Sequence, residues 1–215
     1  MRLIHFNLAL ILIFVGALSL RLYGIFWGLP SEYNPNFSYH PDEFIILEWA
    51  SLLYSGTIRD VHFEYGGTLF LSFINACVKI SATFSNLLPG FNLLAKQLFF
   101  IRLVLVGAAL LTILIVYQIG YRLYDKNTGL IAAALLAVTP GHVIWAQRVR
   151  VDELATLMAV LIFYLAIRLY QRMQQHRQVS VRSWLLAGVC VGAATALRGP
   201  LLLFAIAPLL AYVLS

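Results

Sequence analysis

Two pairs of adjacent carboxylates are the groups in this sequence best suited to chemistry. Asp42 and Glu43 follow a histidine and a proline, and Asp152 and Glu153 follow a basic stretch. A carboxylate can act as a general base on a hydroxyl group. Carboxylates can also bind a divalent cation, in which case Asp42 and Asp152 are the expected ligands. The structural alternative for each pair is a role at a helix N-terminus, where acidic side chains are stabilising.

Several basic side chains could bind a phosphate group near these carboxylates, because arginine forms bidentate contacts with phosphate. Arg102 lies about one turn inside an apolar run, where a charge is expensive. Arg198 separates two apolar runs. The alternative for both is snorkelling to lipid headgroups. His40 and His62 lack the spacing typical of metal-binding histidines. The predicted substrate- or phosphate-binding residues are Asp152, Arg198, Arg102, Arg148 and His40.

The composition indicates a membrane protein. Of the 215 residues, 61% are hydrophobic and only 11% are charged, against about 25% charged in an ordinary soluble domain. This excludes a soluble enzyme, a disordered chain and a nucleic-acid-binding protein. The formal net charge of +6 arises from basic residues at the ends of apolar segments. Cys77 and Cys190 lie inside apolar runs and are expected to be buried thiols, since no metal-binding spacing is present.

The apolar runs predict an all-α transmembrane bundle. A membrane helix needs about 20 mainly apolar residues, and about six runs qualify or come close: 3–22, 98–121, 130–146, 154–170, 184–197 and 201–214. The segment 43–54 is expected to be a helix at the membrane surface.

Basic residues predict the orientation, because loops rich in Lys and Arg stay in the cytoplasm. Residues 168–182 contain four arginines and no acid, which indicates a cytoplasmic loop. Alternating the sides of the membrane at each predicted helix before this loop gives a cytoplasmic N-terminus and a single external segment, 25–97. Within that segment, 66–89 is apolar but carries Lys79 near its middle. Placing a lysine at the centre of a membrane helix costs about 2.5–3.5 kcal/mol of insertion free energy. We therefore expect it to lie on the outer membrane surface. Both acidic pairs then share the extracytoplasmic face.

Five motifs, in order, resemble the GT-C glycosyltransferases. They are R-L-Y-G-I-F-W-G-L-P (21–30), H-P-D-E (40–43), F-E-Y-G-G-T-L-F-L (63–71), R-V-R-V-D-E-L (148–154) and A-L-R-G-P (196–200). The sequence looks most like the bacterial protein-mannosyltransferase-like proteins of glycosyltransferase family 39. These are related to the lipid A aminoarabinose transferases and, distantly, to the oligosaccharyltransferase catalytic subunit. The H-P-D-E element and the aromatic segment before it are the most specific part.

The resemblance implies an enzyme that moves a sugar from a polyprenyl-phosphate donor to an acceptor hydroxyl on the extracytoplasmic face. Asp42 matches the presumed catalytic base of the family, and Glu43 matches its partner. Asp152 matches the acid of a later external loop, and Arg198 matches a basic residue that faces the carrier phosphate. A proline pair seen in protein mannosyltransferases is absent, so the resemblance does not imply protein mannosylation.

The expected organisation is an N-terminal catalytic module over 1–215. Residues 1–24 form its first membrane helix, 25–97 its external loop, and 98–215 its remaining membrane helices. Such enzymes usually have several hundred residues. The expected partners are therefore the sugar donor, the acceptor, the bilayer and a missing C-terminal half. No cofactor is predicted with certainty, although a bound divalent cation is one possibility. The alternative is a non-catalytic membrane subunit that binds a lipid-linked carrier. A transporter is less favoured, since its polar site would lie in mid-membrane.

Overall fold

The computed structural model describes residues 8–31, 33–35, 38–57, 66–84, 89–175 and 178–214. Within these ranges the regular structure is helical and includes no strand, as predicted. The helices are α1 (Leu8–Tyr23), α2 (Pro41–Tyr54), α3 (Thr68–Thr83), α4 (Leu93–Leu123), α5 (Lys126–Val138), α6 (Pro140–Ala146), α7 (Val151–Gln174), α8 (Val181–Leu197), the 3₁₀ helix η3 (Gly199–Ala205) and α9 (Ile206–Val213).

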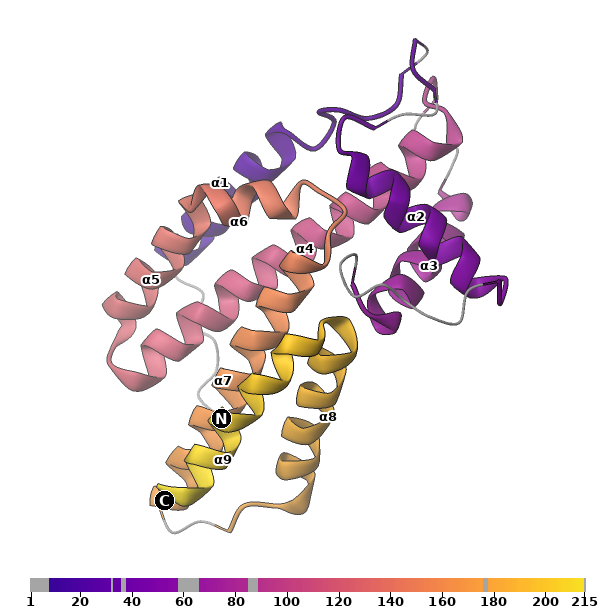
Figure 1. Ribbon diagram of the computed structural model, residues 1–215. Helices are drawn as coiled ribbons and strands as arrows, with labels where there is room; N and C mark the ends of the chain where they lie inside the picture. The colour runs from indigo at the N-terminus through magenta and orange to yellow at the C-terminus, as the bar shows by residue number, and fades with distance from the viewer. Residues whose placement is uncertain are drawn as a thin grey trace.

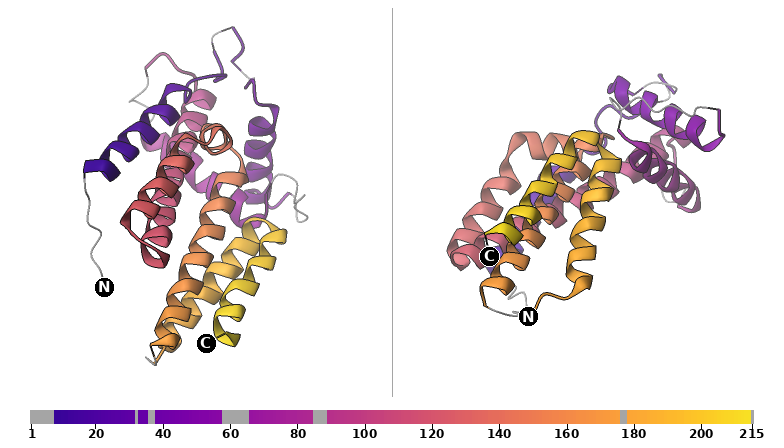
Figure 2. Two further views of the ribbon diagram at one scale, coloured as in Figure 1. Left: turned by 90° about the vertical axis from the view of Figure 1, so that its left-hand side faces the viewer. Right: turned by 60° about the horizontal axis from the view of Figure 1, so that its bottom comes forward.

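The long helix α4 organises the molecule. It packs against α7 along its length, with α1 and α5 on one side (Figure 1). Helices α8 and α9 pack against α7 instead. Helices α2 and α3 pack on each other, and both lie beside the first half of α4, as the two views of Figure 2 also show. There they bury a core that includes Ile46, Phe70 and Ile101.

Two helices, α4 and α7, are long and apolar enough to cross a membrane. A third candidate span is the pair α5 and α6, which is bent by 61°. The bend has a clear cause, because Pro140 begins α6 and its ring cannot continue the preceding helix. Four further apolar elements in the described ranges are shorter, namely α1, α3, α8 and η3–α9. The chain is therefore an integral membrane protein, and the count of six spans stays a prediction.

The described helices differ from the expected runs mainly at proline. The run 130–146 is divided between α5 and α6, and the run 201–214 begins as the 3₁₀ helix η3 after Gly199-Pro200. The surface segments are helical as expected, as α2 and α3. Cys77 and Cys190 are free and buried, as predicted.

Candidate functional site

A buried ion pair between Glu43 and Arg102 fixes the start of α2 on α4. Both side chains are fully inaccessible to solvent. Arg102 Nε and Nη2 donate to the two carboxylate oxygens at 3.0 and 2.7 Å. The same carboxylate accepts from the Ser38 hydroxyl at 2.6 Å and from the backbone N–H of Val149 at 2.8 Å. Arg102 Nη1 donates to the carbonyl of Ile25 at 2.8 Å, and also to that of Trp27. One carboxylate therefore joins the first loop, α4 and the segment before α7.

The neighbouring carboxylate, Asp42, faces the opposite way. Pro41 begins α2, and successive helical residues are about 100° apart around the axis. When Glu43 points into the protein, Asp42 is turned towards solvent, and its side chain is 39% exposed. The acidic pair is thus divided into one buried anchor and one accessible group.

Asp42 begins a row of alternating charges on the surface. Arg150 Nη1 donates to Asp42 Oδ2 at 2.9 Å, and Arg150 Nε donates to Asp152 Oδ2 at 3.1 Å. Arg198 Nη1 donates to Asp152 Oδ1 at 2.8 Å. All four side chains keep substantial exposure, between 23% and 45%. The row Asp42–Arg150–Asp152–Arg198 joins residues from α2, the start of α7 and the end of α8. We call it the charged row.

The second acidic pair repeats this division. Asp152 belongs to the charged row, whereas Glu153 is buried, with Oε1 3.4 Å from His142 Nε2. Arg21 Nη2 lies 2.6 Å from His142 Nδ1. Because a guanidinium group only donates, Nδ1 must accept, and the ring proton is then on Nε2, facing Glu153. Arg21 also donates to the carbonyl of Ala137 at 3.1 Å. The buried side chains of Arg21, His142 and Glu153 thus bring α1, α6 and α7 together, although His142 Nε2 and Glu153 Oε1 form no hydrogen bond within the described residues.

A cavity of about 600 Å³ adjoins this region. Its walls are Tyr23, Gly24, Phe26, Trp27, His40, Ile144, Gln147 and Arg148. Arg148 forms no ion pair within the described part of the chain and lies near the Trp145 ring, at 5.8 Å. His40 is half-buried, and burial lowers the pKa of its ring below the usual value, so it is neutral near pH 7. The cavity therefore offers one unneutralised cation and an aromatic wall.

A close backbone contact sets the position of Arg198. The N–H of Gly67 donates to the carbonyl of Leu197 at 2.7 Å. A Cβ atom on Gly67 would collide with the carbonyl oxygen of Ala196. Only glycine allows the start of α3 to approach the end of α8 so closely. Gly67, in the segment where the sequence lacks the proline pair of protein mannosyltransferases, thus has a packing role here.

The structure brings five of the predicted residues to one end of the bundle in two groups. The charged row includes Asp42, Asp152 and Arg198, and the cavity wall includes His40 and Arg148. The other two predicted residues, Glu43 and Arg102, are buried beneath them. His62 lies outside the described residues.

Sequence reasoning missed Arg150, Arg21, His142 and the separate role of Glu153. Arg21 carried a usable signal, since a charge within an apolar run calls for a partner. The His142–Glu153 contact carried none, because neither residue type nor spacing indicates it. The cation alternative gains no geometric support: Arg150 lies between Asp42 and Asp152. Among the described residues, no group of three or more His, Cys, Asp or Glu side chains could hold a metal.

The comparison with protein families gives a match over the second part of the chain. Residues 87–215 match the sequence model of the dolichyl-phosphate-mannose-protein mannosyltransferase family. The matched segment includes Arg102, Arg148, Asp152 and Arg198, and it begins after Asp42 and Glu43. No curated protein and no solved structure gives a significant match. The match covers more than half of the chain, which therefore belongs to the dolichyl-phosphate-mannose-protein mannosyltransferase family of membrane glycosyltransferases.

Proposed function

We propose that this chain transfers a sugar from a polyprenyl-phosphate donor to an acceptor hydroxyl on the extracytoplasmic face. Asp42 accepts the proton of the acceptor hydroxyl, and the acceptor oxygen forms a bond to the anomeric carbon. The bond from that carbon to the phosphate oxygen breaks on the opposite face, so the configuration inverts. The electron pair of that bond leaves with the polyprenyl phosphate.

The exposure of Asp42 supports this proposal most directly. It is the accessible member of a pair whose other member is buried and fully bonded. Arg150 holds one oxygen of Asp42, and no hydrogen bond to the second oxygen, Oδ1, is found in the described ranges. A carboxylate fixed through one oxygen and open at the other can accept a proton from a bound hydroxyl.

The departing phosphate needs positive charge as the bond breaks. Arg148 is suited to this task, since it lines the cavity and has no carboxylate partner among the described residues. Arg198 is a second candidate at 45% exposure, and it could exchange Asp152 for a phosphate oxygen. The tyrosine and tryptophan side chains of the cavity offer flat apolar surface to the sugar ring or to the first isoprene unit.

Glu43 and Arg102 are proposed as positioning residues. In this proposal Arg102 holds α2 in place and does not contact the phosphate. Its guanidinium group is fully buried and already donates to Glu43 and to two carbonyl groups. Glu43 has no free access to a substrate for the same reason. Together they hold α2 so that Asp42 reaches the charged row.

The test uses a radiolabelled polyprenyl-phosphate sugar with the protein in nanodiscs, measuring both binding and release of the polyprenyl phosphate. Asp42→Asn should bind the donor normally and lower the release rate by about 10²–10⁴-fold, the range for a general base. Glu48→Gln is the matched control, because Glu48 is exposed on the same helix. Equal rates for Asp42→Asn and the control would remove Asp42 from the mechanism.

The same experiment addresses the non-catalytic alternative. The cavity with Arg148 could bind a lipid-linked phosphate without any chemistry at Asp42. Donor binding that is weakened by Arg148→Gln, with no release even in the wild type and with every acceptor class supplied, would favour a carrier-binding subunit over a transferase.

A further inference from the structure

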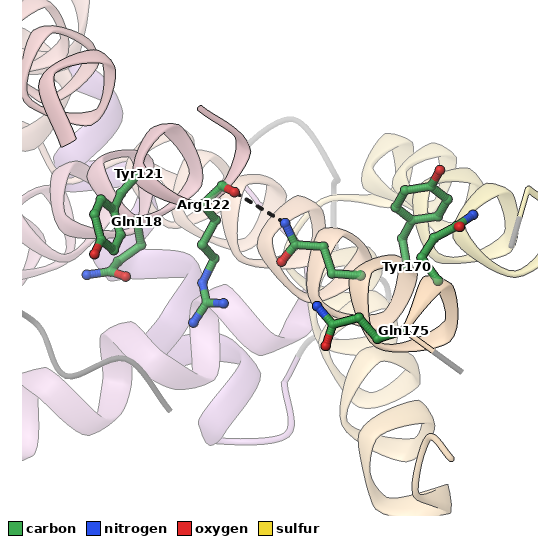
Figure 3. A pocket seen from close by; sticks show the side chains of 7 residues that line it. Gln118, Tyr121, Arg122, Tyr170 and Gln175 are labelled. Atoms are coloured by element: carbon green, nitrogen blue, oxygen red, sulfur yellow. Dashed lines mark hydrogen bonds between the residues drawn. The ribbon is translucent and has the colours of Figure 1, made fainter. Parts of the chain in front are cut away.

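A second cavity lies at the other end of the α4–α7 pair. Its volume is about 650 Å³, within the usual range of small-ligand sites. Its described walls come from the last turns of the two helices: Gln118, Tyr121, Arg122, Tyr170, Gln171, Gln174 and Gln175. Figure 3 shows the Arg122 side chain between Gln118 and Tyr121 on one side and Gln175 on the other.

The cavity lies about one membrane thickness from the candidate site. Arg122 follows Arg102 by twenty residues on the continuous helix α4, which is about 30 Å along the axis. The hydrocarbon core of a bilayer is about 30 Å thick. The two ends of α4 therefore reach opposite headgroup regions, and this cavity is separate from the site of sugar transfer.

The wall chemistry favours an anion. Arg122 is the cation of the described wall, and the described wall residues include no carboxylate. Arg122 forms no ion pair with any described residue. Its Nε is buried and finds no hydrogen-bond partner in the described structure. A buried donor without a partner is costly, and a charged acceptor would satisfy it.

Neighbouring groups add to the positive potential and do not cancel it. The guanidinium groups of Arg122 and Arg168 both lie near the Tyr164 ring, at 5.3 and 5.7 Å. The nearest acid along the chain, Asp125, already caps α5 by accepting from the N–H of Thr128 at 2.7 Å. A basic residue in the last turn of α4 also suits the helix dipole, but that role needs neither a cavity nor a polar wall.

The amide and phenol groups define the ligand further. Glutamine and tyrosine side chains can donate to phosphate oxygens and to hydroxyl groups alike. One of the glutamines is already held in place, since Gln171 Nε2 donates to the carbonyl of Arg122 at 3.3 Å (Figure 3). Arginine with surrounding neutral donors is a typical phosphate-binding arrangement.

We propose that this cavity binds a phosphate group at the membrane face opposite the transfer site, with Arg122 as the main ligand. An anionic phospholipid headgroup and free inorganic phosphate share this chemistry. The ligand is held by the uncompensated Arg122 and by the glutamine and tyrosine side chains around it.

The test is native mass spectrometry of the full chain released from detergent, after exchange with phosphatidylglycerol or phosphatidylcholine. The wild type should retain phosphatidylglycerol preferentially, and Arg122→Gln should weaken that retention roughly tenfold or more, as for loss of a charge-assisted hydrogen bond. Arg182→Gln is the matched control, because Arg182 is exposed at the same end, on α8. Arg122→Lys, which keeps the charge, should retain part of the binding.

Titration with inorganic phosphate identifies the source of the group. Displacement of phosphatidylglycerol by millimolar phosphate supports a site for free phosphate, and no displacement supports a lipid headgroup. Equal retention by the wild type and by Arg122→Gln would overturn the proposal. So would the absence of binding by both probes. If Arg122→Gln fails to fold, Gln175→Glu replaces it: an added carboxylate should repel the phosphate, and unchanged retention would equally overturn the proposal. Sugar transfer is not the readout, so the outcome is independent of the proposed function.

Discussion

The two ends of the α4–α7 pair differ in whether their charged side chains form ion pairs. All four ion pairs between described residues lie at the end near α2, and they join the carboxylates of Glu43, Asp42 and Asp152 to arginine partners. At the other end, no described basic residue forms an ion pair; these residues are Arg122, Lys126, Arg168, Arg172 and Arg182. Charges at the first end are used to build the fold and the charged row, whereas charges at the second end remain available to headgroups and ligands.

This difference has an energetic meaning. Removing one partner of a buried ion pair leaves an uncompensated charge and costs about 3–5 kcal/mol, whereas an exposed pair contributes about 0–1 kcal/mol. The first end should therefore be sensitive to single substitutions and the second end tolerant.

Loss of the Glu43 carboxylate should produce the largest effect. Glu43→Gln leaves Arg102 buried without a counter-charge, and we expect about 3–5 kcal/mol of destabilisation, measured by thermal unfolding in detergent. The double substitution Glu43→Leu with Arg102→Leu should recover part of this loss. Glu48→Gln on the same helix should change little. A Glu43→Gln protein as stable as that control would remove the contrast between the two ends.

Gly67→Ala tests the backbone contact at the first end. The added Cβ would collide with the carbonyl oxygen of Ala196, and we expect about 1–3 kcal/mol of destabilisation from the forced displacement. It should also weaken donor binding if Arg198 moves with the end of α8. Gly192→Ala is the matched control in α8, since nothing lies within 4 Å of its added Cβ, and it should be neutral or up to about 1 kcal/mol stabilising. Similar unfolding temperatures for the two variants would contradict the close approach.

Arg150→Gln and Arg182→Gln compare an arginine from each end directly. Arg150 binds both Asp42 and Asp152 but is about one-third exposed, so its removal should cost about 1 kcal/mol or less. Arg182→Gln should cost nothing measurable. Unfolding should be measured at low and at high salt. Added salt screens the exposed ion pairs of Arg150 and should reduce the difference in stability between the two variants. A difference that is unchanged in high salt would count against an electrostatic origin.

The smallest effect is expected from the pH dependence of His40. Burial lowers the pKa of this ring in the folded protein, with repulsion from Arg148 acting in the same direction. The unfolded state therefore binds the proton first, so stability should be fully present above the ordinary pKa of about 6.5 and should fall as the pH falls through it. Unfolding temperatures between pH 7.5 and 5.5 should decrease less in His40→Gln. Parallel slopes in the two proteins would show that His40 contributes nothing.

The sequence predicted the helical class well, because the apolar runs are long and their ends are marked by charges and prolines. It also predicted that Asp42 and Asp152 share one face, and Arg150 does join them. The cytoplasmic or external position of that face is still a prediction, as is the surface placement of α3. The bend between α5 and α6 was not predicted, since an apolar run with a proline can either kink or break.

The division within each acidic pair could have been anticipated from helix geometry alone. Two adjacent residues on a helix point about 100° apart, which lets one carboxylate of each pair turn inward while the other faces solvent. The partners themselves could not be predicted. Glu43 is satisfied by Arg102 and by the N–H of Val149, groups that come close only after three segments of chain have packed together.

The bonds of Glu43 also impose an order on biosynthesis. Its partner Val149 is made 106 residues later, which at about 5–20 residues per second corresponds to roughly 5–20 s of translation. During that interval the segment that carries Asp42 has no completed anchor. The charged row closes later still, when Arg198 follows Asp152 into place. The charged row is therefore complete only after the end of α8 has been synthesised, and a nascent chain stalled before that point would leave Asp152 without its contact to Arg198.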